Sequence, residues 1–213
     1  MNRGSDVHET PPATVAAEKT ALRKRLITIR SQMPDIFRND AGRLIRDDLL
    51  SLPELGAAGT VAAYYSLGSE PPTGSLIYAL WKRGSYVILP VLLPDGDLDW
   101  ASYEGPDSLV PGRLGLLEPA EARRGVDTVS RADVVLVPAL AVSVAGQRLG
   151  RGGGSYDRAL ARVGPQVPTI ALLYDDELLP SVPVAEHDRP VRAVARPSHG
   201  ITWLPARLSL AVG

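Results

Sequence analysis

The fold is decided by the segment DVVLVPALAVSVAGQRLGRGGGSYDRALARVGPQVPTIALLY, residues Asp133–Tyr174. It opens with a short apolar run, Asp133–Pro138, and closes with another, Thr169–Tyr174, and both are typical of buried strands. Between them lie a glycine-rich loop and a stretch with helical spacing, Ser155–Val163. A strand, a helix and a second strand in this order predict a βαβ unit with parallel strands.

The same alternation precedes this segment. Thr60–Leu67 and Tyr86–Leu92 are further apolar runs, and Gly74–Arg83 between them has the spacing of a helix. The alternating pattern of Leu98–Tyr103 predicts an edge strand or hairpin. Together these segments predict an α/β fold: a single three-layer domain with a mostly parallel central sheet flanked by helices on both faces.

Two amphipathic helices are expected before the first strand. In Glu18–Met33, the apolar residues Leu22, Leu26 and Ile29 recur at helical spacing, and basic residues take the other face. Ile36–Leu50 repeats the pattern before a proline. The apolar side of each helix is expected to face the core.

Two segments lack a clear period. Ser108–Gly125 is rich in glycine and proline, which predicts a long surface loop. Val182–Gly213 contains several prolines and two short apolar runs, Ile201–Leu204 and Leu208–Val212. These runs are compatible with edge strands or with loops.

Composition bounds the domain and its surroundings. The 213 residues suit one domain, residues 18–213, after a disordered N-terminal tail, residues 1–17, of mixed polar composition. A net charge of −1 provides no overall positive electrostatic field that would attract nucleic acid. The absence of cysteine excludes disulfides, cysteine-held metals and a thiol nucleophile. The sequence has neither an apolar run long enough to span a membrane nor the apolar region of a secretory signal, so we expect a cytoplasmic protein. We also expect it to be a monomer.

The glycine-rich loop favours phosphate binding. Gly150 and Gly152–Gly154 let successive backbone N–H groups converge, and the helix that follows adds its N–H groups. Arg148 and Arg151 supply guanidinium charge suited to phosphate. The loop is neither a Walker A motif nor the dinucleotide fingerprint. A flexible connector is the alternative, and Asp157 could either cap the helix or hold Mg²⁺.

The string GQRLGRGGGSYDRAL closely resembles the signature of the 5-formyltetrahydrofolate cyclo-ligases, also called methenyltetrahydrofolate synthetases. Three further blocks agree with that family in order and spacing. They are Lys19-Thr-Ala-Leu22-Arg23, the segment YYSLGSEPPTGSLI that contains Glu70, and Val182-Pro183 through Asp188.

The resemblance implies an ATP-dependent conversion of 5-formyltetrahydrofolate to 5,10-methenyltetrahydrofolate, with release of ADP and phosphate. ATP would phosphorylate the formyl oxygen, N10 would attack, and phosphate would leave. The enzyme's part in such a step is positioning and charge neutralisation. The implied partners are therefore a small-molecule folate and ATP as co-substrate with Mg²⁺, and neither nucleic acid nor a membrane.

The resemblance also implies residue roles. Catalysis is assigned to Lys19, Arg148 and Arg151, and Mg²⁺ to Asp157 and Asp188. The implied ATP-binding residues are Lys19, Arg23, Arg148, Leu149, Gly150, Arg151, Gly152, Gly153, Gly154, Ser155 and Tyr156. The implied folate-binding residues are Arg23, Tyr65, Glu70 and Tyr156.

Each assignment has a structural alternative. Lys19 and Arg23 could form a solvated helix face, Glu70 could be a loop residue, and Tyr65 a core aromatic. His187, which has no role in the family pattern, is expected to be an exposed loop histidine.

The sequence departs from the family pattern at several positions. Ser155 replaces the first of two tyrosines before Asp157, and Gly153 replaces the lysine of some relatives. Near the chain end, Arg192 and Ala195-Arg196 replace an acidic residue and a threonine. These changes leave open a relative that binds nucleotide or folate in a regulatory role with little or no turnover, or a different phosphotransfer enzyme on the same scaffold.

Overall fold

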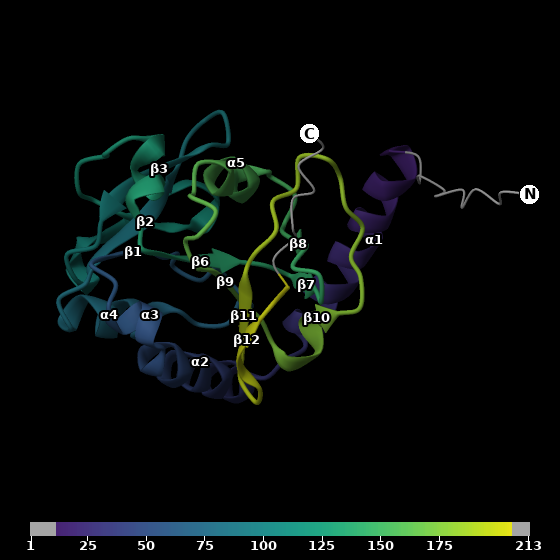
Figure 1. The fold of residues 1–213 in the computed structure, drawn as a ribbon, viewed down its shortest axis with the longest axis horizontal. Helices are drawn as coiled ribbons and strands as arrows, with labels where there is room; N and C mark the ends of the chain where they lie inside the picture. The colour runs from purple at the N-terminus through teal and green to yellow at the C-terminus, as the bar shows by residue number, and fades with distance from the viewer. Residues whose placement is uncertain (1–11, 206–213) are drawn as a thin grey trace, which may run out of the picture.

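The computed structural model describes residues 12–205 (Figure 1). The helices are α1 Pro12–Ser31, α2 Asp35–Ser51, α3 Pro53–Gly56, α4 Gly74–Lys82 and α5 Ser155–Ala161, with 3₁₀ turns η1 Pro106–Ser108, η2 Arg113–Gly115, η3 Val126–Arg131 and η4 Asp175–Glu177. The strands are β1 Thr60–Ala62, β2 Tyr86–Leu92, β3 Leu98–Ser102, β4 Leu109–Pro111, β5 Leu117–Pro119, β6 Val134–Pro138, β7 Ala141–Ser143, β8 Arg148–Leu149, β9 Thr169–Leu172, β10 Leu178–Leu179, β11 Ala193–Arg196 and β12 Gly200–Trp203.

Seven strands form the central sheet in the order β12-β11-β9-β6-β1-β2-β3. The five inner strands are parallel, and only the edge strands β3 and β12 pair antiparallel. The predicted edge strand at Leu98–Tyr103 is therefore confirmed, because β3 pairs with β2 alone.

Alternation along the inner strands separates two cores. Val61 and Ala63 face the core beneath α2, α3 and α4, whereas Ala62 between them faces the core beneath α5 and η3. Both cores consist mainly of buried aliphatic side chains, and each also contains one buried aromatic residue, Tyr103 in the first and Trp100 in the second. Figure 1 shows α2 to α4 on one side of the sheet and α5 on the other. The predicted three-layer α/β fold is confirmed.

A second, three-stranded sheet of order β10-β7-β8 lies beside the central one, and α1 covers it. The α1 helix begins at Pro12, so it includes residues 12–17, which composition had placed in the disordered tail. Proline is favoured in the first turn, and alanines and a glutamate follow it, which explains the earlier start. The rest of the predicted tail lies outside the described residues.

The prediction of which residues of α1 are buried is only partly confirmed. Leu26 is buried, but Ile29 is 48% exposed, whereas Lys19 and Arg30 are 7% and 1% exposed. The two cations face inward because the surface beneath α1 offers carboxylates rather than a purely apolar wall. Helical periodicity identifies the apolar stripe of an amphipathic helix, but it cannot identify a charged residue that is buried in an ion pair.

Other differences concern segment lengths. The strand predicted over Thr60–Leu67 ends at Ala62, because the chain then enters a turn held by side-chain hydrogen bonds. The predicted surface loop Ser108–Gly125 contains the short hairpin β4–β5. Ile201–Leu204 largely corresponds to β12, while Leu208–Val212 lies outside the described residues. Within residues 12–205, no helix combines the length and apolar content needed to cross a membrane.

Candidate active site

A cavity of about 410 Å³ opens at the carboxyl ends of the inner parallel strands, where α/β folds bind ligands. Tyr64, Leu92 and Pro138, which lie at or just beyond the ends of β1, β2 and β6, form part of its wall. All the residues that the sequence assigned to ATP, folate and metal line this cavity, namely Lys19, Arg23, Tyr65, Glu70, Arg148, Leu149, Gly150, Arg151, Gly152, Gly153, Gly154, Ser155, Tyr156, Asp157 and Asp188.

The glycine-rich loop connects β8 to α5 along one side of the cavity. Gly152 has φ +108°, and a Cβ there would lie 3.4 Å from the Arg23 Cζ atom. Arg23 in turn donates a 2.9 Å hydrogen bond from Nε to the Gly150 carbonyl. The loop therefore rests against α1, and glycine at 152 permits both the backbone angle and the close approach.

Three cations from the predicted site pair with three of its carboxylates. Arg148 Nη2 lies 2.8 Å from Asp157 Oδ1, Lys19 Nζ bonds Asp188 Oδ2, and Arg151 Nε lies 3.0 Å from Glu70 Oε1. Except for Arg151, which is 42% exposed, the side chains of these pairs are largely buried. The reading of Lys19 as part of a solvated helix face is therefore wrong.

Asp157 does not cap α5. The residue before the helix, Gly154, has no side-chain cap, and Asp157 Oδ1 instead accepts from Arg148 and from the backbone N–H of Arg189 at 3.1 Å. Asp157 therefore joins the loop to the segment that carries Asp188.

The turn after β1 is fixed by its own side chains. Glu70 Oε2 accepts the Leu67 N–H at 2.8 Å, and Glu70 Oε1 accepts Arg151 Nε at 3.0 Å. Thr73 Oγ1 donates to the Tyr64 carbonyl at 2.7 Å. Glu70 is 8% exposed, so it is a bonded group of the cavity wall rather than a free loop residue.

Two tyrosines in the wall have buried hydroxyls. Neither the Tyr64 nor the Tyr156 hydroxyl has a hydrogen-bond partner among the described residues. Burial, reinforced by the charge of Glu70, raises the pKa of both phenols. Both hydroxyls therefore stay protonated near neutral pH and can donate to a polar group in the cavity. Tyr64 was not predicted as a site residue, because an aromatic residue in an apolar run cannot be distinguished by sequence from a residue of the hydrophobic core.

The outer wall is apolar. It comes from the β4–β5 hairpin, which contributes Leu114, Leu116 and Leu117. Leu114 is 80% exposed and has φ +56°. His187 lies at the rim with its side chain 76% exposed, as the sequence predicted for a loop histidine.

The donors predicted for Mg²⁺ fit that ion in chemistry and number. Mg²⁺ commonly takes one or two carboxylates together with substrate phosphates and water. Asp157 Oδ2 and Asp188 Oδ1 accept no hydrogen bond from the described residues. Across residues 12–205, no three acidic or histidine side chains gather into a group that could hold a metal without such a substrate.

A family described as the 5-formyltetrahydrofolate cyclo-ligase family matches residues 15–197. The chain is 39% identical over 191 residues to a 5-formyltetrahydrofolate cyclo-ligase of Mycolicibacterium smegmatis, covering 87% of this chain and 97% of the relative. It is 35% identical over 184 residues to the enzyme of that name from Escherichia coli K12, covering 85% and 98%. The NMR structure of Aquifex aeolicus 5,10-methenyltetrahydrofolate synthetase has a TM-score of 0.76 at 27% identity, covering 87% of this chain and 92% of that one.

Proposed function

The chain belongs to the 5-formyltetrahydrofolate cyclo-ligase family, and from that premise we propose that its 410 Å³ cavity converts 5-formyltetrahydrofolate to 5,10-methenyltetrahydrofolate with ATP. The observation that carries the assignment to this cavity is its division into two kinds of wall. The glycine-rich loop, β8 and α1 contribute backbone amides and the cations Lys19, Arg23 and Arg148, whereas the β4–β5 hairpin contributes leucines. A polyphosphate and a flat heterocycle need these two environments.

The proposed chemistry transfers a phosphoryl group and then expels it. The formyl oxygen attacks the γ-phosphorus, the bond to the ADP oxygen breaks, and an imidate-like phosphate forms. N10 then bonds the formyl carbon, loses its proton to solvent, and phosphate leaves with the former formyl oxygen. Lys19, Arg148 and Arg151 neutralise charge on the transferred group, which is the main contribution a protein can make to such a step.

The folate occupies the apolar side of the cavity in this proposal. Tyr65 and the hairpin leucines cover its rings, while Glu70 accepts from its N–H donors. The buried hydroxyl of Tyr156 faces a polar atom of the bound substrate. Arg23 lies between the two substrates, since it contacts the loop through Gly150.

Asp157 and Asp188 would hold Mg²⁺, which would offset the negative charge of the phosphates. Both carboxylates lie in the cavity wall, and each keeps an oxygen without a hydrogen bond from the described residues. We further propose that the enzyme works as a monomer in the cytoplasm; its cysteine-free sequence is compatible with that reducing compartment.

The activity is tested with purified protein, 5-formyltetrahydrofolate and Mg·ATP, by following the near-UV absorbance of the methenyl product. Stoichiometric ADP release with that product supports the proposal. Tight ATP binding without product would instead indicate a regulatory relative, the alternative raised by Ser155.

The metal assignment is tested by Asp157→Asn, which keeps side-chain size but removes the negative charge. We expect kcat/KM to fall about 100-fold or more, because the loss of metal-borne charge neutralisation raises the barrier by several kcal/mol. Asp40→Asn, at an exposed position of α2, is the matched control. Wild-type turnover by Asp157→Asn over a full Mg²⁺ titration would show that the metal assignment is wrong.

A further inference from the structure

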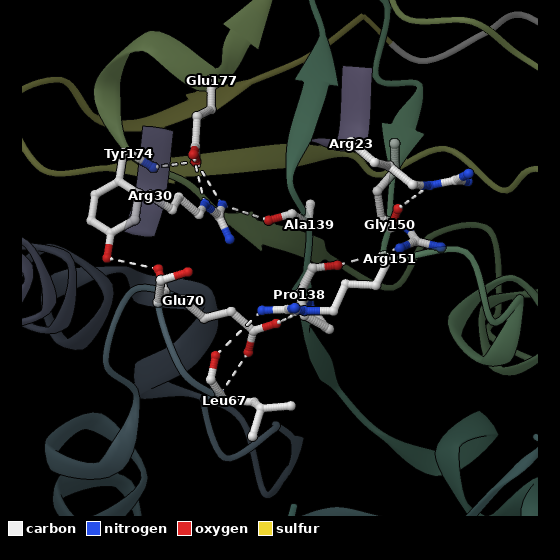
Figure 2. Close-up of polar contacts among 12 residues, drawn as sticks. Arg23, Arg30, Leu67, Glu70, Pro138, Ala139, Gly150, Arg151, Tyr174 and Glu177 are labelled. Atoms are coloured by element: carbon white, nitrogen blue, oxygen red, sulfur yellow. Dashed lines mark hydrogen bonds and ion pairs between the residues drawn. The ribbon is translucent and has the colours of Figure 1, made fainter. Parts of the chain in front are cut away.

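Arg30 is the least exposed charged side chain among the described residues, at 1%. Its Nε and Nη2 atoms form two 2.7 Å bonds to the two carboxylate oxygens of Glu177, and Nη2 also donates to the Ala139 carbonyl at 2.7 Å. Ala139 lines the cavity, although Arg30 itself does not. The side chain thus joins α1 to two other segments at the base of the site (Figure 2).

Tyr174 extends this contact towards the folate side. Its ring lies under the guanidinium, 5.4 Å from centroid to Cζ, and its backbone N–H donates to Glu177 Oε2 at 2.8 Å. The Tyr174 hydroxyl donates to the Ser69 carbonyl at 3.2 Å. Ser69 precedes Glu70, so the phenol holds the turn from which Glu70 projects.

The contacts then return to α1. Glu70 bonds Arg151 of the glycine-rich loop, and the carbonyl of the preceding residue, Gly150, accepts from Arg23. Arg23 and Arg30 are seven residues apart on one helix, and therefore lie on the same face. Figure 2 shows Arg30 and Arg23 at opposite sides of the same group of polar contacts, with Glu70 and Arg151 below them.

We propose that Arg30 is a positioning residue for the reaction: through Glu177 and Tyr174 it fixes the turn that presents Glu70 to the folate. This inference rests on the proposed function for its assay. Replacing both members of a buried ion pair by aliphatic side chains is often neutral for stability, so folding alone does not require the Arg30–Glu177 pair. The planar guanidinium fork, however, can bond acceptors from two segments while lying over an aromatic ring of one of them.

Tyr174→Phe tests the proposal, because it removes only the hydroxyl that reaches Ser69. We expect the KM for 5-formyltetrahydrofolate to rise about 2- to 10-fold, the range for one neutral hydrogen bond. The KM for ATP and kcat should stay at wild-type values, while the thermal midpoint should fall by the few degrees expected for one lost hydrogen bond. Tyr78→Phe, which removes a hydroxyl from an exposed tyrosine of α4, should change none of these quantities.

Arg30→Lys keeps the charge but loses the fork, so the same KM should rise at least as much. If Arg30 acts through Tyr174, the double variant should show no larger rise than Arg30→Lys alone. Should Arg30→Lys fail to fold, Tyr174→Phe decides. An unchanged folate KM in Tyr174→Phe, or equal changes for folate and ATP, would overturn the proposal. Failure of the proposed function is distinguishable, since the wild-type protein would then make no methenyl product.

Discussion

Lys19 and Lys24 lie on the same helix in different surroundings. Lys19 is buried against Asp188 in the cavity wall, whereas Lys24 is exposed. For Lys19→Met we expect kcat/KM for ATP to fall about 10- to 100-fold, as for the loss of one charge-assisted hydrogen bond to phosphate. The KM for folate should change little. Steady-state kinetics with each substrate varied in turn provides the measurement.

Lys24→Met is the matched control, since it removes the same charge from the same helix away from the cavity. It should leave both KM values and the thermal midpoint unchanged. Equal losses of ATP affinity in the two variants would mean that long-range charge on α1, rather than contact at Lys19, attracts the nucleotide.

Individual site residues were predictable where their chemistry is local. The run from Arg148 to Tyr156 predicts a phosphate loop, because its glycines expose successive backbone N–H groups and its arginines add positive charge, and the structure places this run in the cavity wall. The pair of Arg30 and Glu177 was not predictable, since its members are 147 residues apart. Only the path of the chain between them brings the two charges together, and a lone arginine in a helix carries no sign of burial.

At the scale of elements, α2 contacts the turn that carries Glu70 through Gly42, which lies against Pro72. A Cβ at this position would lie 2.8 Å from the Pro72 carbonyl oxygen and 3.0 Å from the Pro72 Cβ. Gly42→Ala should therefore lower the free energy of unfolding by about 1 kcal/mol, because crowding outweighs the gain in helix propensity. Urea unfolding followed by circular dichroism measures the change.

Gly56, at the end of α3, offers the matched control, because an added Cβ there meets no atom within 4 Å. Gly56→Ala should raise the free energy of unfolding by about 0.4–1 kcal/mol through the unfolded chain. A stabilised Gly42→Ala variant would show that the Pro72 turn shifts readily, and so would argue against a rigid mount for Glu70.

Elements with a strong period were predicted well, and those fixed by neighbours were not. The apolar run Tyr86–Leu92 coincides with β2, since a strand buried on both faces leaves a continuous apolar signature. The hairpin β4–β5 was predicted only as a loop, because its strands have three residues each and contain prolines. The hydrogen bonds between its two strands depend on contacts with the rest of the protein, which a local sequence pattern does not indicate.

At the scale of the molecule, the two sides of the cavity must keep their spacing, and Asp97 contributes to this. It lies in the turn between β2 and β3, with its two oxygens 3.0 and 2.6 Å from Arg162 just beyond α5. The neighbouring Arg158 donates to the Gly153 carbonyl of the glycine-rich loop. The pair therefore ties the edge of the sheet to the helix that follows the loop.

The Arg162 hydrogen bond lowers the pKa of Asp97 in the folded protein, although burial opposes it. A carboxyl whose pKa is lower in the folded than in the unfolded state stabilises the fold when ionised. This contribution is complete above the unfolded value, near 3.9, and is lost as the pH falls through the folded value. Asp97→Asn should therefore lower the free energy of unfolding by about 1 kcal/mol at pH 7, and by progressively less below about pH 4. Denaturant unfolding of both proteins at pH 7 and near pH 3 measures the difference, and a gap of equal size at the two pH values would mean that Asp97 acts by packing and not by charge.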